Sequence, residues 1–122
     1  MEELKEFAFV DCLFIDFKVG ILLSSLELIL EAYYPLQQDN SREKGLIKLN
    51  FSGIKKIALE KNSEFDLDIY KPYDSSGDDT KANELYLVQV NNVENGLIQG
   101  IIHSDMINIE LQTDSFTLSK VN

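Results

Sequence analysis

Residues 47–60 read IKLNFSGIKKIALE, and this stretch decides how the chain is expected to fold. Apolar and polar side chains alternate on both sides of a central Ser52-Gly53 pair, with Ile47, Leu49 and Phe51 before it. Alternation with a period of two is the pattern of a strand with one buried face. Because a Ser-Gly pair is typical of a tight turn, the stretch predicts a β-hairpin with lysines on its outer face.

The same alternation recurs upstream of the predicted hairpin, over residues 13–19. The residues expected to face the core are Leu13, Ile15, Phe17 and Val19. Phe14 and Cys12 fall on the opposite parity, so we expect both to lie on the outer side of this strand.

Downstream, residues 64–70 alternate again, with carboxylates on the outer parity where the preceding hairpin carries lysines. A meander of strands is expected after residue 84. Its parts are a strand at 85–90, a type I′ turn at Asn95-Gly96, a return strand at 97–102, a turn at Ser104-Asp105, a strand at 106–111 and a short final strand around 116–118.

Residues 24–34 fit two structures. Ser24 and Glu27 have the spacing of a helix capping box, and Pro35 would end a helix after Tyr34. The same residues also alternate, with Leu26 at the start of the apolar set. We favour a strand because strands surround the segment, and a short helix at 24–34 stays open as the alternative.

Regular short strands without βαβ alternation predict a mainly β fold, an antiparallel sandwich or partly open barrel of about seven to nine strands. The length of 122 residues predicts a single domain over 1–122. Residues 71–83 concentrate Pro, Gly, Ser and Asp, which indicates a long loop.

The composition is that of an ordinary globular protein, with 44% hydrophobic and 26% charged residues. Cys12 is the single cysteine, so no internal disulfide can form, and the acidic Glu2 and Glu3 after Met1 do not have the pattern expected of a signal peptide. The longest apolar stretch, residues 19–30, is interrupted by polar residues and is too short for a membrane helix. These features predict a cytoplasmic protein without a membrane association.

Charge changes sign along the chain. Residues 1–40 carry a net charge of −6, residues 41–61 carry +4 and residues 62–122 carry −8, which gives −10 in total. Such a charge steers association toward a basic partner and disfavours nucleic acid. Pairing between the lysines of 47–60 and the carboxylates of 64–70 would account for part of the alternation if those strands are neighbours.

Few residues could carry out chemistry. His103, Ser104 and Asp105 are the residue types of a hydrolase triad, but three consecutive residues cannot converge on one another. Cys12 lies between acids, which disfavours its thiolate. Neighbouring carboxylates such as Asp66 are most simply solvated on a strand. We therefore expect a non-enzymatic protein with no catalytic residue, no cofactor and no metal site.

A calcium site is the metal site that comes nearest to a match. Asp74, Ser76, Asp78 and Asp79 place hard oxygen atoms around Gly77. Their spacing does not match an EF-hand loop, and no bidentate Glu stands at its twelfth position. Weak calcium binding by the 71–83 loop stays open.

Binding to a protein through an acidic surface is the expectation that remains. Tyrosines beside carboxylates are common at interfaces. The predicted partner-binding residues are Glu64, Asp66, Asp68, Tyr70, Tyr73, Asp74, Asp78 and Asp79.

Two segments carry a family resemblance. The run from Phe51 to Ile57, followed by an alternating strand, and the later run from Gly100 to Ser104 resemble small bacterial β-rich proteins of the YxiG-like type. The resemblance covers about half of the chain and transfers no functional residue. It implies a cytoplasmic immunity protein that inhibits a cognate toxin by binding it.

Three alternatives remain beside the inhibitor. The first is a small-molecule or carbohydrate-binding β-barrel with tyrosines lining a concave pocket. The second is a hydrolase with two converging carboxyl groups. The third is a homo-oligomer in which the basic hairpin of one subunit docks on the acidic strand of another.

Overall fold

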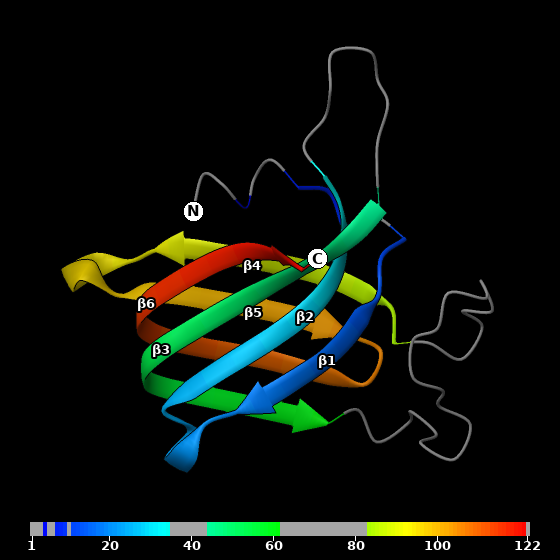
Figure 1. The fold of residues 1–122 in the computed structure, drawn as a ribbon. Coiled ribbons are helices and arrows are strands. Elements are labelled where there is room, and N and C mark those ends of the chain that lie inside the picture. The colour runs from blue at the N-terminus through cyan, green and yellow to red at the C-terminus, as the bar shows by residue number, and fades with distance from the viewer. Residues whose placement is uncertain (1–3, 5–6, 10, 35–43, 62–82, 122) are drawn as a thin grey trace.

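The computed structural model describes residues 4, 7–9, 11–34, 44–61 and 83–121, which form one antiparallel sheet of six strands (Figure 1). The strands are β1 (Phe14–Val19), β2 (Ser25–Tyr33), β3 (Lys44–Lys61), β4 (Leu85–Asn92), β5 (Ile98–Ser104) and β6 (Ile107–Val121). Short 3-10 segments, η1 (Ile21–Leu23) and η2 (Glu94–Gly96), lie in the β1–β2 and β4–β5 connections. The strand order in the sheet is β1-β2-β3-β6-β5-β4, and the sheet is not closed.

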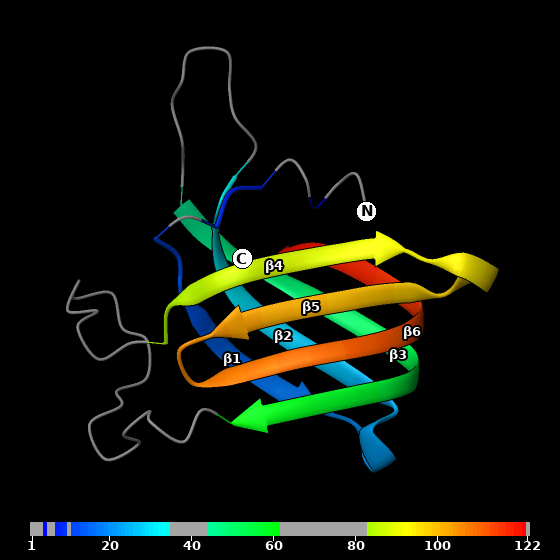
Figure 2. The same ribbon diagram turned by 180° about the vertical axis from the view of Figure 1, so that it is seen from behind.

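The sheet folds over on itself into two layers, as Figures 1 and 2 show from opposite sides. The two central strands, β3 and β6, are long and bent, so each runs through both layers. One layer contains β1, β2 and one half of each central strand, and the other contains β4, β5 and the remaining halves. The predicted mainly β, antiparallel architecture is confirmed.

The prediction of a hairpin over 47–60 is wrong, because Lys44–Lys61 is one continuous strand that pairs with β6 along its length. Ser52 and Gly53 bend the strand instead of reversing it. Gly53 has φ +67°, a conformation that favours glycine, and the register shifts just beyond it. A Cβ atom at Gly53 would lie 2.9 Å from Oδ2 of Asp114. Thr113 fixes the bend, since its hydroxyl donates a hydrogen bond of 2.5 Å to the Ser52 carbonyl.

Strand β6 likewise joins two predicted strands, 106–111 and 116–118, into one strand that bends beside β3. The described residues therefore form six strands where about seven to nine were predicted. Each central strand has two stretches of alternating side chains separated by a bend, and a sequence pattern does not distinguish such a bend from a turn.

The predicted facing of β1 is corrected at its N-terminal end. Cys12 and Phe14 are fully buried, although the alternation placed both on the outer side. The register with β2 shifts between Phe14 and Asp16, where a β-bulge inserts one extra residue. Phe14 therefore faces the core together with Phe17 and Val19, and the two phenylalanine rings pack edge to face at 6.0 Å.

The segment 24–34 is a strand, as favoured from the sequence. β2 pairs with β1 on one side and with β3 on the other. Its apolar residues Leu26, Leu28 and Leu30 are fully buried in the core, which a helix could not achieve at a spacing of two. Ser24 caps no helix, because its hydroxyl donates to the carbonyl of Ile21.

The space between the layers is filled by apolar side chains. The largest fully buried ones are Phe14, Phe51, Leu26, Leu28, Leu30, Ile47, Leu49, Ile102 and Ile109. The two edge strands meet at one corner, where the amide of Phe14 donates to the Asn83 carbonyl (2.7 Å) and the amide of Leu85 donates to the Cys12 carbonyl (2.9 Å). These contacts hold β1 and β4 together at one end of the open sheet.

The two turns predicted in the second half of the chain are confirmed. Asn95 and Gly96 both have positive φ (65° and 75°), as a type I′ turn requires, and they connect β4 to β5. Ser104 begins the β5–β6 turn, and its buried hydroxyl donates a hydrogen bond of 2.8 Å to the carbonyl of Ile107.

Candidate protein-binding surface

The partner-binding residues predicted from the sequence all lie in 62–82, outside the described residues. They are Glu64, Asp66, Asp68, Tyr70, Tyr73, Asp74, Asp78 and Asp79. The predicted strand at 64–70, the candidate calcium ligands and all of the 71–83 loop except Asn83 lie outside them as well. Their part in binding stays a prediction.

Three lysines of β3 form ion pairs with acids of the neighbouring strands. Lys44 lies 3.1 Å from Glu31 and Lys48 lies 3.6 Å from Glu27, both on β2. Lys55 lies 3.1 Å from Asp114 on β6. Lysines of β3 therefore pair across strands with acids of β2 and β6, whereas the pairing expected with the carboxylates of 64–70 lies outside the described residues and stays a prediction.

The pair of Lys44 and Glu31 is the most buried of these. The Glu31 side chain is 7% exposed and that of Lys44 is 35% exposed. The ammonium group also donates a hydrogen bond of 2.9 Å to the carbonyl of Asp11 and lies 5.3 Å from the centre of the Tyr33 ring. Burial lowers the pKa of Lys44, but the interaction with Glu31 outweighs it and the net pKa is raised.

The described tyrosines do not line a common pocket. Tyr34 packs edge to face against Phe7 at 6.0 Å, and the ammonium of Lys120 lies 4.4 Å from its ring centre. Tyr86 is exposed on β4, and its hydroxyl donates to the carboxylate of Asp105, which raises the Tyr86 pKa to about 12. No tyrosine lines the three hollows formed by Lys56 and its neighbours, by Phe7 and its neighbours, and by Lys18 and its neighbours.

His103 and Cys12, two of the reactive residues considered from the sequence, lie in the described part of the chain. His103 lies on β5, where its Nε2 atom is 4.0 Å from a carboxylate oxygen of Glu110. Burial raises the pKa of Cys12 to about 11, so the thiol stays protonated at neutral pH. The expectation of a disfavoured thiolate is thus met, although the main cause is burial instead of the neighbouring acids.

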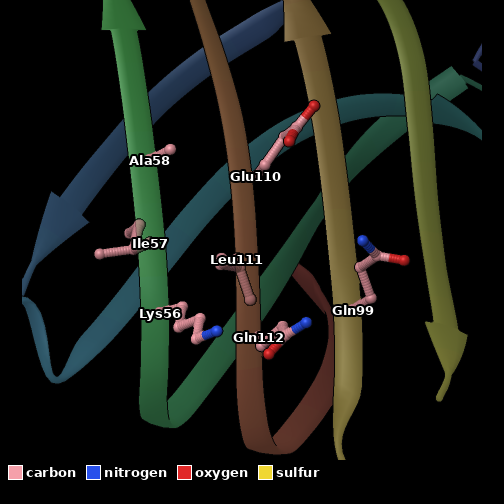
Figure 3. A pocket seen from close by; sticks show the side chains of 7 residues that line it. All are labelled: Lys56, Ile57, Ala58, Gln99, Glu110, Leu111 and Gln112. Carbon is pink, nitrogen blue, oxygen red and sulfur yellow. The ribbon is translucent and has the colours of Figure 1, made fainter.

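A shallow hollow of about 220 Å³ lies on the outer side of the β3, β6 and β5 strands (Figure 3). The polar side chains of Lys56, Gln99, Glu110 and Gln112 line it. Figure 3 shows that these side chains come from three adjacent strands. The hollow contains no tyrosine and lies outside the core, so it differs from the interior pocket of a ligand-binding barrel.

The β1–β2 turn is a surface feature that no sequence pattern predicted. Ile21 and Leu22 are 85% and 95% exposed, and Leu23 is also exposed. Three consecutive apolar residues stand here between Gly20 and Ser24, in a position where polar turn residues are usual. In the sequence they belong to the apolar stretch of residues 19–30, and no local signal places a turn within it.

The described residues contain no group of three or more His, Cys, Asp or Glu side chains that could hold a metal ion. None of the helical segments in the described ranges has the length and apolar character needed to cross a membrane.

No protein-family model and no curated protein sequence matches this chain.

Proposed function

We propose that this domain is a non-enzymatic, acidic protein-binding domain that acts in the cytoplasm as an immunity-type inhibitor of a basic toxin or enzyme. The observation that carries the proposal is the pairing of the β3 lysines. Lys44, Lys48 and Lys55 each face a carboxylate of an adjacent strand, so three of the six basic residues of 41–61 are already paired within the sheet.

The excess negative charge determines the chemistry of the partner. The described residues contain ten acids and seven bases, a net charge of −3, and the remaining −7 of the total −10 belongs to the other residues. A partner with a positive surface would therefore be attracted at long range, which raises the association rate more than the affinity. Many nucleases and other nucleic-acid-binding enzymes have such a basic surface, because they bind phosphates.

Affinity capture from the native host tests the proposal. The purified chain is immobilised and exposed to host lysate at low and at high salt, and the retained proteins are identified. We expect a basic protein that is retained at low salt and lost at high salt, since charge attraction between exposed groups is screened. Failure to retain any basic protein, or equal retention at both salt concentrations, would contradict the proposal.

Charge reversal then tests the predicted contact surface. The triple variant Glu64→Lys, Asp66→Lys and Asp68→Lys should slow association with the captured protein by roughly tenfold or more at low salt. A control variant reverses three acids in the described strands or beside them, Glu60, Glu84 and Glu110, and has the same net charge. If both variants slow association equally, net charge alone matters and residues 64–68 are not the contact.

A further inference from the structure

The β1–β2 turn is the most exposed apolar feature of the described residues. Ile21 and Leu22 leave 85% and 95% of their surface in water, and Leu23 leaves 41%. The turn projects from one end of the two layers (Figure 1). A contiguous group of exposed apolar side chains usually marks an interaction site, because it gains free energy when a partner removes it from water.

The backbone of this turn is unfavourable for the residues that occupy it. Leu22 and Leu23 have φ values of 55° and 59°, in the left-handed region that branched and bulky side chains rarely adopt. The β4–β5 turn has the same two positive φ angles but uses Asn95 and Gly96, the residues that tolerate them best. The chain therefore contains a suitable turn sequence at one hairpin and an unsuitable, apolar one at the other.

Hydrogen bonds order the turn. The amide and the hydroxyl of Ser24 both donate to the carbonyl of Ile21, at 3.0 Å and 2.7 Å. At its base, the amide of Gly20 donates to the carbonyl of Ser25 at 2.9 Å. The amide of Ile54 on β3 donates to the Ser24 carbonyl at 3.1 Å, which ties the turn to the bend of the sheet. The apolar side chains are thus presented on a fixed backbone, which lowers the entropy cost of binding.

Beside the turn lies a second surface feature, a hollow of about 300 Å³. Its polar lining includes Lys18, Glu27, Asn50 and Ser52. The β1–β2 turn and this hollow adjoin at Gly20 and Ser25, so a partner that covers the turn would also reach the polar groups around it. An apolar centre with a polar rim is the usual composition of a protein interface.

We infer that Ile21, Leu22 and Leu23, here named the apolar turn, insert into an apolar pocket on the protein partner. The inference rests on the proposed function and adds the residues that anchor the complex. Charge selects a protein over a membrane as the occupant: a chain with net charge −10 is repelled by anionic lipid, whereas a basic protein surface attracts it.

The variant Leu22→Asn/Leu23→Gly tests the inference, because it copies the residues of the β4–β5 turn. If the leucines are present for binding and not for folding, this variant should unfold at a midpoint temperature a few degrees higher than the wild type. It should also bind the partner identified by capture roughly 100-fold more weakly, since each buried leucine contributes about tenfold. The matched control is Leu59→Asn, which removes an exposed leucine from β3 and should leave the affinity unchanged.

The outcomes separate the apolar turn from the proposed function. The inference is supported if the wild type retains a basic partner and the turn variant, but not the Leu59→Asn control, binds the purified partner more weakly. Equal affinity of wild type and turn variant, or a turn variant that is less stable than the wild type, overturns it while the proposed function stands. If the wild type retains no basic protein, the proposed function fails and the inference fails with it.

Two further measurements use defined probes. Binding of the wild type, but not of the turn variant, to vesicles of phosphatidylcholine and phosphatidylglycerol would show a lipid-binding turn and overturn the inference. A concentration-dependent dimer in size-exclusion chromatography that the turn variant abolishes would show that a second copy covers the turn, which also overturns it. With neither effect, the protein partner remains the occupant.

Discussion

Replacement of Lys44 by methionine should destabilise the domain, because it leaves the carboxylate of Glu31 buried without its cation. The two charged groups are 3.1 Å apart, which corresponds to about 5 kcal/mol of Coulomb attraction at an effective dielectric constant of about 20. Breaking a fully buried pair costs about 3–5 kcal/mol. Since the Lys44 side chain is 35% exposed, water screens the pair, and we expect a loss of about 1–3 kcal/mol in the free energy of unfolding.

Urea denaturation at neutral pH measures this loss, with Lys48→Met as the matched control. Lys48 lies on the same strand, and both partners of its pair with Glu27 are 36% exposed, so its replacement should cost less than about 0.5 kcal/mol. A Lys44→Met variant no less stable than Lys48→Met would refute the reasoning. The reasoning would also be refuted if the double variant Lys44→Met/Glu31→Gln showed no energetic coupling between the two residues.

The pH dependence of the same pair follows from the raised pKa of Lys44. Its stabilising contribution is fully present below the ordinary lysine pKa and is lost as the pH rises through the raised value. The difference in stability between wild type and Lys44→Met should therefore shrink in strongly alkaline solution.

Three other predictions concern single residues. Gly53→Ala should lower the free energy of unfolding by about 1–2 kcal/mol because of the positive φ, and should lower it further because the new Cβ atom meets Asp114. Gly96→Ala is the control, since Gly96 also has a positive φ but lies in open space, so it shows the first effect alone. Urea denaturation measures both variants. Tyr86 should deprotonate at about pH 12 in an ultraviolet titration. Its hydrogen bond to Asp105 therefore stabilises the fold fully below the ordinary tyrosine pKa, and this stabilisation is lost as the pH rises toward 12. Asp105→Asn should return the Tyr86 pKa toward its usual value, and an unchanged titration would contradict this. Cys12, with a pKa of about 11, should react with Ellman's reagent only after unfolding, and rapid reaction of the native protein would contradict its burial.

Local sequence signals predicted those parts of the fold that local chemistry controls. Asn95-Gly96 forms the expected turn, because few other residue pairs adopt two positive φ angles. Residues 25–33 form the expected strand, because leucines spaced by two match the buried face of a sheet.

The errors arose where tertiary contacts decide the backbone. Ser52-Gly53 has turn chemistry, but Thr113 and the continuous pairing with β6 make it a bend within one strand. Phe14 faces the core because of a β-bulge that no local sequence pattern predicts. The apolar turn was missed because its leucines have no turn propensity, which is also the reason that it suggests a function.

The pairing of β3 with β6 has a consequence for how the chain folds. The pair closest in sequence is Lys61 with Ile107, and the most distant is Leu46 with Val121, so no local hairpin can nucleate the centre of the sheet. The backbone must close a long loop before its main ladder forms, and such topologies fold in about milliseconds to seconds. Loop-closure entropy grows slowly, by about 0.6 kcal/mol for each doubling of length. The connection between β3 and β4 can therefore be lengthened during evolution at little cost to the rest of the domain.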